Sequence, residues 1–153
     1  MSKKLLKELK ETDLAYIAGL LDGEGYIGIV GRGEKQKGYR ATVTISSTNS
    51  EIILWLKSVL DGSVYQSTHR NKRWKDSWEW KLSTRNVIPL LTSLIPYLKI
   101  KKTQASLVCD FQGNVRLGGY KSKMERDIEE VFHSKSLVLN KKGALEPEKY
   151  KEA

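Results

Sequence analysis

The chain has 153 residues, a length typical of one domain, and 39% of them are hydrophobic, which is enough for a core and excludes a disordered chain. Lysine and arginine total 27 against 18 acidic residues, so the net charge of +9 favours a polyanionic partner such as nucleic acid. One cysteine, Cys109, and two histidines exclude an internal disulfide and a four-ligand Cys/His zinc site within one chain.

The first part of the chain predicts a helix followed by two strands. Thr12 or Asp13 can cap a helix over about residues 14–23. Strands are expected over residues 26–30 and 39–48, and the second of them alternates apolar and polar residues at period two. Glycines interleaved with charges separate the two strands, which indicates a turn.

The middle of the chain repeats this order of a helix and two strands. Asn49 or Ser50 can cap a helix that ends at about Leu60, because Asp61 and Gly62 stop it. Residues 64–69 and 77–83 predict a β-hairpin around a long basic turn.

Helices are expected over the rest of the chain, at about residues 86–95, 102–111 and 123–139. The last of these follows a capping-box sequence, S-K-M-E, that begins at Ser122. The order of elements predicts an α+β fold in which a four-stranded antiparallel sheet carries helices on one face. We expect a single domain over residues 1–153, with a polar tail from about residue 141.

No apolar run approaches the length of a membrane-spanning helix, and residues 1–11 are polar rather than a signal peptide. We therefore expect an intracellular protein, cytoplasmic or organellar, that does not bind a membrane. The exposed sheet face would carry hydroxyl groups and charges, which suits contact with nucleic acid. From the strand pattern alone, an ordinary hydrated sheet face is the simpler interpretation.

The glycines at positions 23, 25 and 28 form a literal G-x-G-x-x-G sequence. A dinucleotide-binding loop must follow a strand and open a helix, whereas these glycines follow a helix and open a strand. We therefore reject a nucleotide-binding interpretation.

A stripe of small residues, Ala15, Gly19 and Gly23, recurs every four residues along the first helix. Such a stripe permits the close approach of a second helix. An ordinary crossing inside one chain is the alternative, but no other helix of this sequence carries a matching stripe. A second copy of the same helix in a symmetric homodimer is therefore the simplest partner.

Two acidic residues, Asp22 and Glu24, follow at the carboxyl end of this helix. Acids are disfavoured there by the helix dipole, and a symmetric helix pair would also bring the two copies of Glu24 together. Solvation of both acids is the ordinary alternative. Bound divalent cations give a reason to gather like charges at this place.

Residues 17–25 read I-A-G-L-L-D-G-E-G and resemble the signature of the LAGLIDADG homing endonucleases. The substitutions are conservative, with Ile17 for leucine, Leu21 for isoleucine, Gly23 for alanine and Glu24 for aspartate. The order of elements resembles this family up to about Leu139. The presence of one motif implies the homodimeric type of the family, which dimerises through the motif helix.

The resemblance implies a role for five residues. Glu24 would bind the metal ion at the scissile phosphate, the carbonyl of Gly23 would add a ligand, and Asp22 would support the helix ends or the metal site. Asn49 would position the attacking water, and Lys101 would supply positive charge to the transition state. The expected cofactor is Mg²⁺, or another divalent cation such as Mn²⁺ or Ca²⁺.

The resemblance also implies that the polar sheet face reads DNA, with Trp78 and Trp80 on the opposite, core face. The candidates for base contacts are Gly28, Val30, Arg32, Arg40, Thr42, Thr44, Ser46, Thr48, Tyr65, Ser67, His69, Glu79 and Lys81. Among them, Arg32 and Arg40 suit guanine. The candidates for phosphate contacts in the basic turn are Arg70, Lys72, Arg73 and Lys75.

The function that these expectations imply is the metal-dependent hydrolysis of both strands of a long, pseudo-palindromic double-stranded DNA site by a homodimer. Two alternatives remain open at this point. One is an RNA-binding intron maturase built on the same scaffold. The other is a DNA-binding regulator whose nuclease site has decayed.

Overall fold

A four-stranded antiparallel sheet with the strand order β1-β2-β4-β3 forms the centre of the fold. The computed structural model describes residues 3–68, 71, 73–116 and 118–141. The strands are β1 (Gly25–Gly31), β2 (Tyr39–Ser47), β3 (Ser63–Ser67) and β4 (Ser77–Ser83). The helices are α1 (Lys3–Glu8), α2 (Glu11–Glu24), α3 (Ser50–Leu60), α4 (Val87–Leu94), α5 (Lys102–Asn114) and α6 (Lys123–Asn140), with short 3-10 turns η1 (Thr84–Asn86) and η2 (Ile95–Tyr97).

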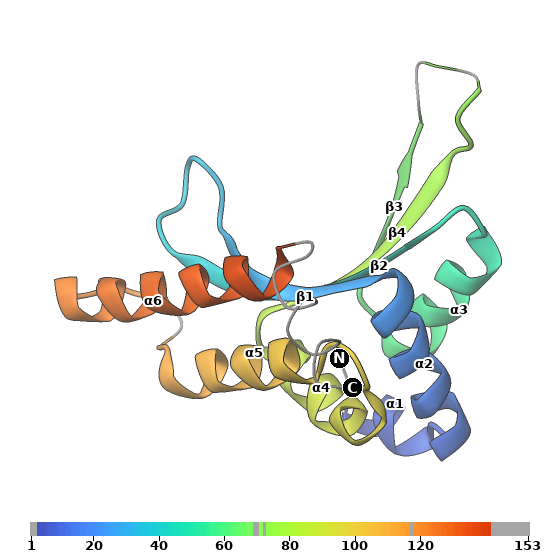
Figure 1. The fold of residues 1–153 in the computed structure, drawn as a ribbon, viewed down its shortest axis with the longest axis horizontal. Coiled ribbons are helices and arrows are strands. Elements are labelled where there is room, and N and C mark those ends of the chain that lie inside the picture. The colour runs from blue at the N-terminus through green and yellow to red at the C-terminus, as the bar shows by residue number, and fades with distance from the viewer. Residues whose placement is uncertain (1–2, 69–70, 72, 117, 142–153) are drawn as a thin grey trace, which may run out of the picture.

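One face of the sheet is apolar and buried under helices. Alternation at period two places the apolar side chains of each strand on this face, and they are Ile27, Ile29, Ala41, Val43, Ile45, Trp80 and Leu82. Figure 1 shows α2, α4 and α5 on one side of the sheet, while the turns of the two hairpins rise on the other side. The predicted α+β class, with helices covering one face of a four-stranded antiparallel sheet, is therefore confirmed.

The free edge of β1 is covered by α6, which runs alongside it (Figure 1). The backbone N–H of Ile29 donates to the Ser136 hydroxyl at 2.9 Å, and the Asn140 side-chain amide donates to the Ile27 carbonyl at 3.0 Å. An edge strand exposes unpaired backbone groups that invite pairing with another chain. In this protein, α6 satisfies two of them with side chains.

Most predicted helix boundaries agree with the structure. Asn49 caps α3, and Ser122 and Glu125 form the predicted capping box at the start of α6. The motif helix is an exception, because α2 begins at Glu11 rather than near residue 14. Asp13 occupies the third position of the helix and accepts a hydrogen bond from the Lys10 N–H, so it acts inside the first turn rather than before it.

Two further differences from the prediction are an additional helix and a shorter strand. The sequence analysis did not identify α1, which is only six residues long. Strand β3 ends at Ser67 rather than at residue 69. Among the described residues, every helix is too short or too polar to span a membrane.

Candidate active site and nucleic-acid interface

The junction between α2 and β1 is built around Gly25. A side chain at this position would bring its Cβ to 2.7 Å from the Leu21 carbonyl oxygen and 2.8 Å from the Leu21 Cα. No Cβ is tolerated at such distances, so only glycine allows the chain to turn directly from the helix into the sheet. The consequence is that Glu24, the last residue of α2, lies exposed at the start of the central sheet.

Lys101 caps the carboxyl end of α2. Its amine donates to the carbonyls of Leu21 at 2.7 Å, Asp22 at 3.0 Å and Gly25 at 2.6 Å. A lysine amine has three donors, so these bonds use all of them. They add acceptor partners to the carbonyls at the end of α2 and the start of β1, where the Leu21 carbonyl also accepts from the backbone N–H of Gly25. Burial lowers the pKa of Lys101, while the negative charges of Asp22 and Glu24 raise it.

Asp22 fixes the other side of the same turn. Its carboxylate accepts hydrogen bonds from the backbone N–H groups of Lys99 at 2.7 Å, Ile100 at 3.2 Å and Lys101 at 3.0 Å. Both carboxylate oxygens are engaged in this way. Together with the bonds of the Lys101 amine, these bonds anchor the segment 99–101 to α2 in both directions.

Glu24 differs from Asp22 in having its carboxylate open. Within the described residues it forms no hydrogen bond and no ion pair, and its side chain is exposed. The described part of the chain also contains no group of three or more acidic, histidine or cysteine side chains able to hold a metal ion. One protomer thus offers a single carboxylate and nearby carbonyls. That donor set suits Mg²⁺, which keeps several waters and uses one or two carboxylates together with substrate phosphates.

Asn49 lies at the same end of the sheet as Glu24. Gly25 pairs with Ile45, and β2 continues past this pair toward Ser47 and then Asn49. The Asn49 side-chain oxygen caps α3 by accepting from the backbone N–H groups of Glu51 at 2.9 Å and Ile52 at 3.3 Å. The side-chain nitrogen of Asn49 has no hydrogen-bond partner among the described residues, so this NH2 group remains available to a ligand.

The small-residue stripe of α2 is exposed along its whole length. Ala15, Gly19 and Gly23 all lie on the surface, and a Cβ added at either glycine would meet no atom of another part of the described chain within 4 Å. Tyr16, 53% exposed, borders the stripe and packs edge-on against Trp55 with ring centroids 5.7 Å apart. The apolar face of the same helix, formed by Ile17, Ala18 and Leu21, is buried in the core.

The second face of the sheet is polar, as the strand pattern predicted. The register aligns Thr44 with Lys81, Ser46 with Glu79, and Glu79 with Tyr65 across three neighbouring strands. Arg40, Thr44, Ser46, Tyr65, Ser67, Glu79 and Lys81 lie on this face and are partly or fully exposed. Trp80 is fully buried and Trp78 packs against the core, which confirms their predicted position on the opposite face.

Arg40 and Lys81 line a polar hollow of about 270 Å³ on this face, together with Tyr65 and Ser83. The Nε atom of Arg40 is buried and has no hydrogen-bond partner within the described residues. A buried donor without a partner is costly unless a ligand or water completes it. This hollow is therefore a place where an acceptor group, such as a base edge or a phosphate oxygen, would be stabilised.

Two of the predicted base-contacting positions are closed in the structure. Thr42 is 2% exposed, and its hydroxyl lies 3.4 Å from the Leu82 carbonyl and the Ser83 hydroxyl. Gly28 is buried because the Tyr26 ring lies over it. Both residues lie on the predicted face, but neighbouring side chains cover them.

Of the remaining described candidates, Val30 pairs with Arg40 in the β1–β2 ladder, and the others lie outside the ladders. Arg32 is half-buried, and its Nε donates to the Tyr39 carbonyl at 3.2 Å. Thr48 is exposed just after β2, and Val30 is partly exposed near the other end of β1. In the basic turn, Arg73 and Lys75 are exposed between β3 and β4. His69, Arg70 and Lys72 lie outside the described residues.

The sequence analysis missed a group of basic residues that lies near Arg32, on the segment between α5 and α6 and on the beginning of α6. Arg116, Lys121 and Arg126 belong to this group. A signal was present in the sequence, because these cations surround the adjacent glycines Gly118 and Gly119. Nothing in the sequence placed this segment beside the β1–β2 turn, which is a tertiary contact.

No protein-family model matches the chain, and no curated protein matches its sequence. Solved structures do match its fold. The archaeal intron-encoded homing endonuclease I-Vdi141I in complex with DNA has a TM-score of 0.71 at 13% identity, over 87% of this chain and 87% of that one. The homing endonuclease I-CvuI in complex with the I-CreI target has a TM-score of 0.66 at 21% identity, over 84% and 82%.

A third similar structure is the I-SmaMI LAGLIDADG homing endonuclease bound to cleaved DNA, with a TM-score of 0.62 at 12% identity. This alignment covers 88% of the present chain but 51% of the longer one. The motif helix with its exposed small stripe, the polar sheet face and these three alignments agree with one another. The chain therefore has the fold of the LAGLIDADG homing endonucleases.

Proposed function

We propose that this protein is a homodimeric, single-motif LAGLIDADG endonuclease that hydrolyses both strands of a long, pseudo-palindromic double-stranded DNA site with the help of divalent metal ions. One observation carries the proposal. The open carboxylate of Glu24 lies where an exposed small-residue stripe on α2 meets the start of a sheet whose free face is polar.

The exposed stripe supports dimerisation. Two α2 helices can approach closely along Ala15, Gly19 and Gly23, because none of these residues carries side-chain bulk beyond a methyl group. A twofold axis beside this stripe brings the two Glu24 residues near each other, each at the end of its own helix. One carboxylate is then available for each strand of a duplex.

The metal-binding groups in this proposal are the Glu24 carboxylate and the Gly23 carbonyl. Bound Mg²⁺, or Mn²⁺ or Ca²⁺ in its place, would lower the pKa of the attacking water and stabilise the leaving oxygen. The chain's own contribution is positional. Lys101 holds three carbonyls around the end of α2, and Asp22 holds the segment 99–101, so the backbone on both sides of Glu24 is fixed.

The polar sheet face supports DNA as the substrate. It carries Arg40 and Lys81 beside hydroxyl groups, and the chain as a whole has a net charge of +9. The three similar structures described above are complexes with DNA, and the DNA bound to I-SmaMI is cleaved. I-CvuI was studied with Mg, where the DNA was not cleaved, and with Ca. These properties belong to those proteins and come to this chain by the shared fold.

The test is cleavage of a long, random-sequence DNA library by the wild-type protein in Mg²⁺, followed by sequencing of the new ends. The expected result is double-strand breaks at a recurrent site whose two halves are related by inverted repetition, with no breaks in EDTA. Binding of the duplex without breaks in Mg²⁺ or Mn²⁺ would instead favour a DNA-binding regulator. Binding of structured RNA in preference to DNA would favour a maturase.

A further inference from the structure

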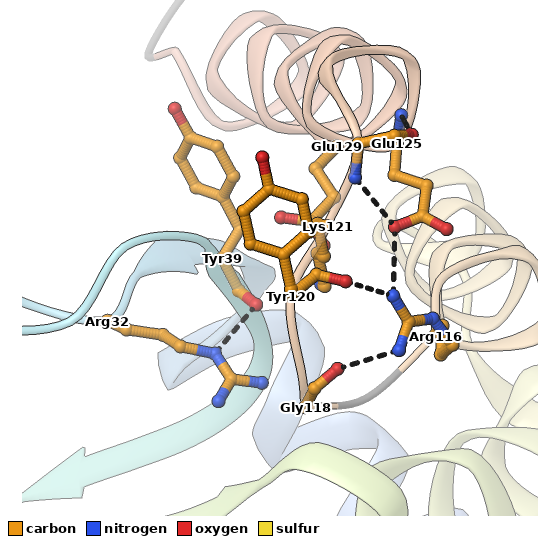
Figure 2. Close-up of polar contacts among 9 residues, drawn as sticks. Arg32, Tyr39, Arg116, Gly118, Tyr120, Lys121, Glu125 and Glu129 are labelled. Carbon is orange, nitrogen blue, oxygen red and sulfur yellow. Dashed lines mark hydrogen bonds and ion pairs between the residues drawn. The ribbon is translucent and has the colours of Figure 1, made fainter.

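A second basic site lies at the far end of β1 from Glu24. It is a hollow of about 260 Å³ between the β1–β2 turn and the segment that joins α5 to α6. Its charged lining consists of Arg32, Lys37, Lys121, Arg126 and Glu129. Figure 2 shows Arg32 reaching in from the β1–β2 hairpin on one side and Arg116 on the other, with Tyr120 and Lys121 between them.

The charges of this hollow do not cancel. Lys121 forms an ion pair with Glu129, and these side chains are 14% and 2% exposed. Just beside them, Arg116 pairs with Glu125 at 3.2 Å. Three cations, Arg32, Lys37 and Arg126, are left without an ion pair among the described residues.

The concentration of positive charge affects the neighbouring lysine. Burial lowers the pKa of Lys121, and the positive charge of Arg32 lowers it further. Close like charges destabilise one another unless an anion lies between them. The hollow is thus built for a ligand that carries negative charge.

The backbone around the hollow keeps it open. Gly38, Gly118 and Gly119 all have positive φ angles, between 73° and 105°, which other residues rarely adopt. A Cβ on Gly119 would lie 2.9 Å from the Arg116 guanidinium. That guanidinium also donates to the carbonyls of Gly118 and Tyr120, so the segment is held in place before any ligand binds (Figure 2).

The hollow lies next to the end of the polar sheet face that is farther from Glu24. Arg32 comes two residues after Val30, and its backbone N–H bonds to the Gly38 carbonyl, so it continues the polar face beyond the ladder. The seven residues of β1 separate it from Glu24. At a rise of about 3.3 Å per residue, the steps from Glu24 to Arg32 span about 26 Å, or about eight base pairs of duplex.

We propose that the hollow between the β1–β2 turn and the α5–α6 segment binds one backbone phosphate of the bound duplex, about eight base pairs outside the phosphate at Glu24. This assignment rests on the proposed DNA-binding function. It makes Arg32 a phosphate-binding residue rather than a reader of guanine, since its Nε is already committed to the Tyr39 carbonyl. Lys37 and Arg126 complete the contact from the turn and from α6.

The test compares two double variants of equal charge. Lys37→Gln with Arg126→Gln alters the hollow. Lys35→Gln with Lys123→Gln alters exposed residues of the same turn and the same helix that do not line it. Affinity for a random-sequence 30-base-pair duplex is measured against KCl concentration by fluorescence anisotropy, and melting temperatures confirm that all proteins are folded.

The expected result is that the slope of log affinity against log salt becomes shallower by about 0.9 for each protomer in the hollow variant, which corresponds to one lost phosphate contact. The control variant is expected to lose less than half of that. An equal change of the slope in the two variants would overturn the proposal that the hollow binds a phosphate, while leaving the nuclease proposal intact. Failure of the wild-type protein to bind any duplex would overturn the proposed function itself.

Discussion

The last turn of α2 has two sides that are built in opposite ways. On one side Asp22 and Lys101 join the helix to the segment 99–101 through six hydrogen bonds, three accepted by the carboxylate and three donated by the amine. On the other side, a Cβ added at Gly19 or Gly23 would meet no atom of another part of the described chain within 4 Å, and the Glu24 carboxylate forms no hydrogen bond or ion pair among the described residues. Contacts within the described chain account for the first side but not for the second.

The open side is unfavourable for an isolated protomer. Each glycine within the helix costs about 1 kcal/mol relative to alanine, and no close contact inside the described chain requires Gly19 or Gly23. A carboxylate at the negative end of a helix is unfavourable as well. The second helix and the cation of the proposed function would offset these costs, so the comparison of the two sides supports placing the function at the open side.

The largest expected effect is on catalysis, from Glu24→Gln. The amide keeps the shape of the side chain but removes the hard anionic ligand, so strand cleavage in Mg²⁺ is expected to fall by at least about 1000-fold, in the range found for removal of an essential catalytic group. Because the variant also removes a negative charge near phosphates and at a helix end, DNA affinity and thermal stability are expected to remain or to rise slightly. Plasmid cleavage, anisotropy and thermal melting measure the three quantities.

If Glu24→Gln cleaves DNA at a rate near wild type, Glu24 is not the metal-binding residue. Asp22 would then be the next residue to test. A loss of stability together with activity would instead mean that Glu24 has a structural role, like Asp22 and Lys101 on the hydrogen-bonded side of the turn.

The next effect concerns the dimer and is probed by Gly19→Leu. The space around Gly19 is open in the protomer, so the fold is expected to tolerate the leucine and even to gain helix propensity. The same leucine would hold two α2 helices apart and convert the protein to a monomer. Sedimentation velocity at micromolar concentration, without DNA, distinguishes the two species, and a monomeric wild-type protein would contradict the proposed interface.

A smaller effect, on stability, is expected from Asp22→Asn, which changes the side of the turn that is hydrogen-bonded to the segment 99–101. The new amide group replaces an acceptor that faces backbone N–H groups, so at least one hydrogen bond to a charged group is lost, at a cost of about 1.5 to 3 kcal/mol in the free energy of unfolding. Urea denaturation measures this cost. Unchanged stability would show that the bonds of Asp22 do not hold the segment 99–101.

The fold was largely predictable because local patterns determine it. The period-two alternation of residues 39–48 and the caps at Asn49 and Ser122 identified their elements directly. The first helix was placed three residues late because Asp13 is equally suited to the cap and to the third position. Helix α1 was missed because six residues carry too little periodicity to stand out.

The site was predictable only in part. Sequence resemblance identified Glu24, Asp22 and Lys101 as belonging together, and the structure brings the last two into direct contact. The resemblance did not predict that all three N–H groups of the Lys101 amine would donate to backbone carbonyls, or that neighbouring side chains would cover Thr42. Those outcomes depend on contacts between residues 40 to 80 positions apart, which no local pattern encodes.

The smallest effect separates two roles for Lys101. In the structure its three donors are all engaged with the end of α2 and the start of β1, so we expect a positioning residue rather than one that contacts the phosphate. Lys101→Met is then expected to loosen the Glu24 backbone and weaken metal binding. At limiting Mg²⁺, cleavage should slow about tenfold, the low end of the effect of losing a residue that supports a metal ligand. At saturating Mg²⁺ the maximal rate is expected to return to within about threefold of wild type, a difference that leaves transition-state stabilisation nearly intact.

A direct electrostatic role of Lys101 predicts the opposite, an unchanged Mg²⁺ midpoint with a maximal rate lowered at least about 100-fold. A Mg²⁺ titration of the cleavage rate for the two proteins distinguishes these outcomes, because saturating metal can compensate for a displaced ligand but cannot replace a missing positive charge at the transition state.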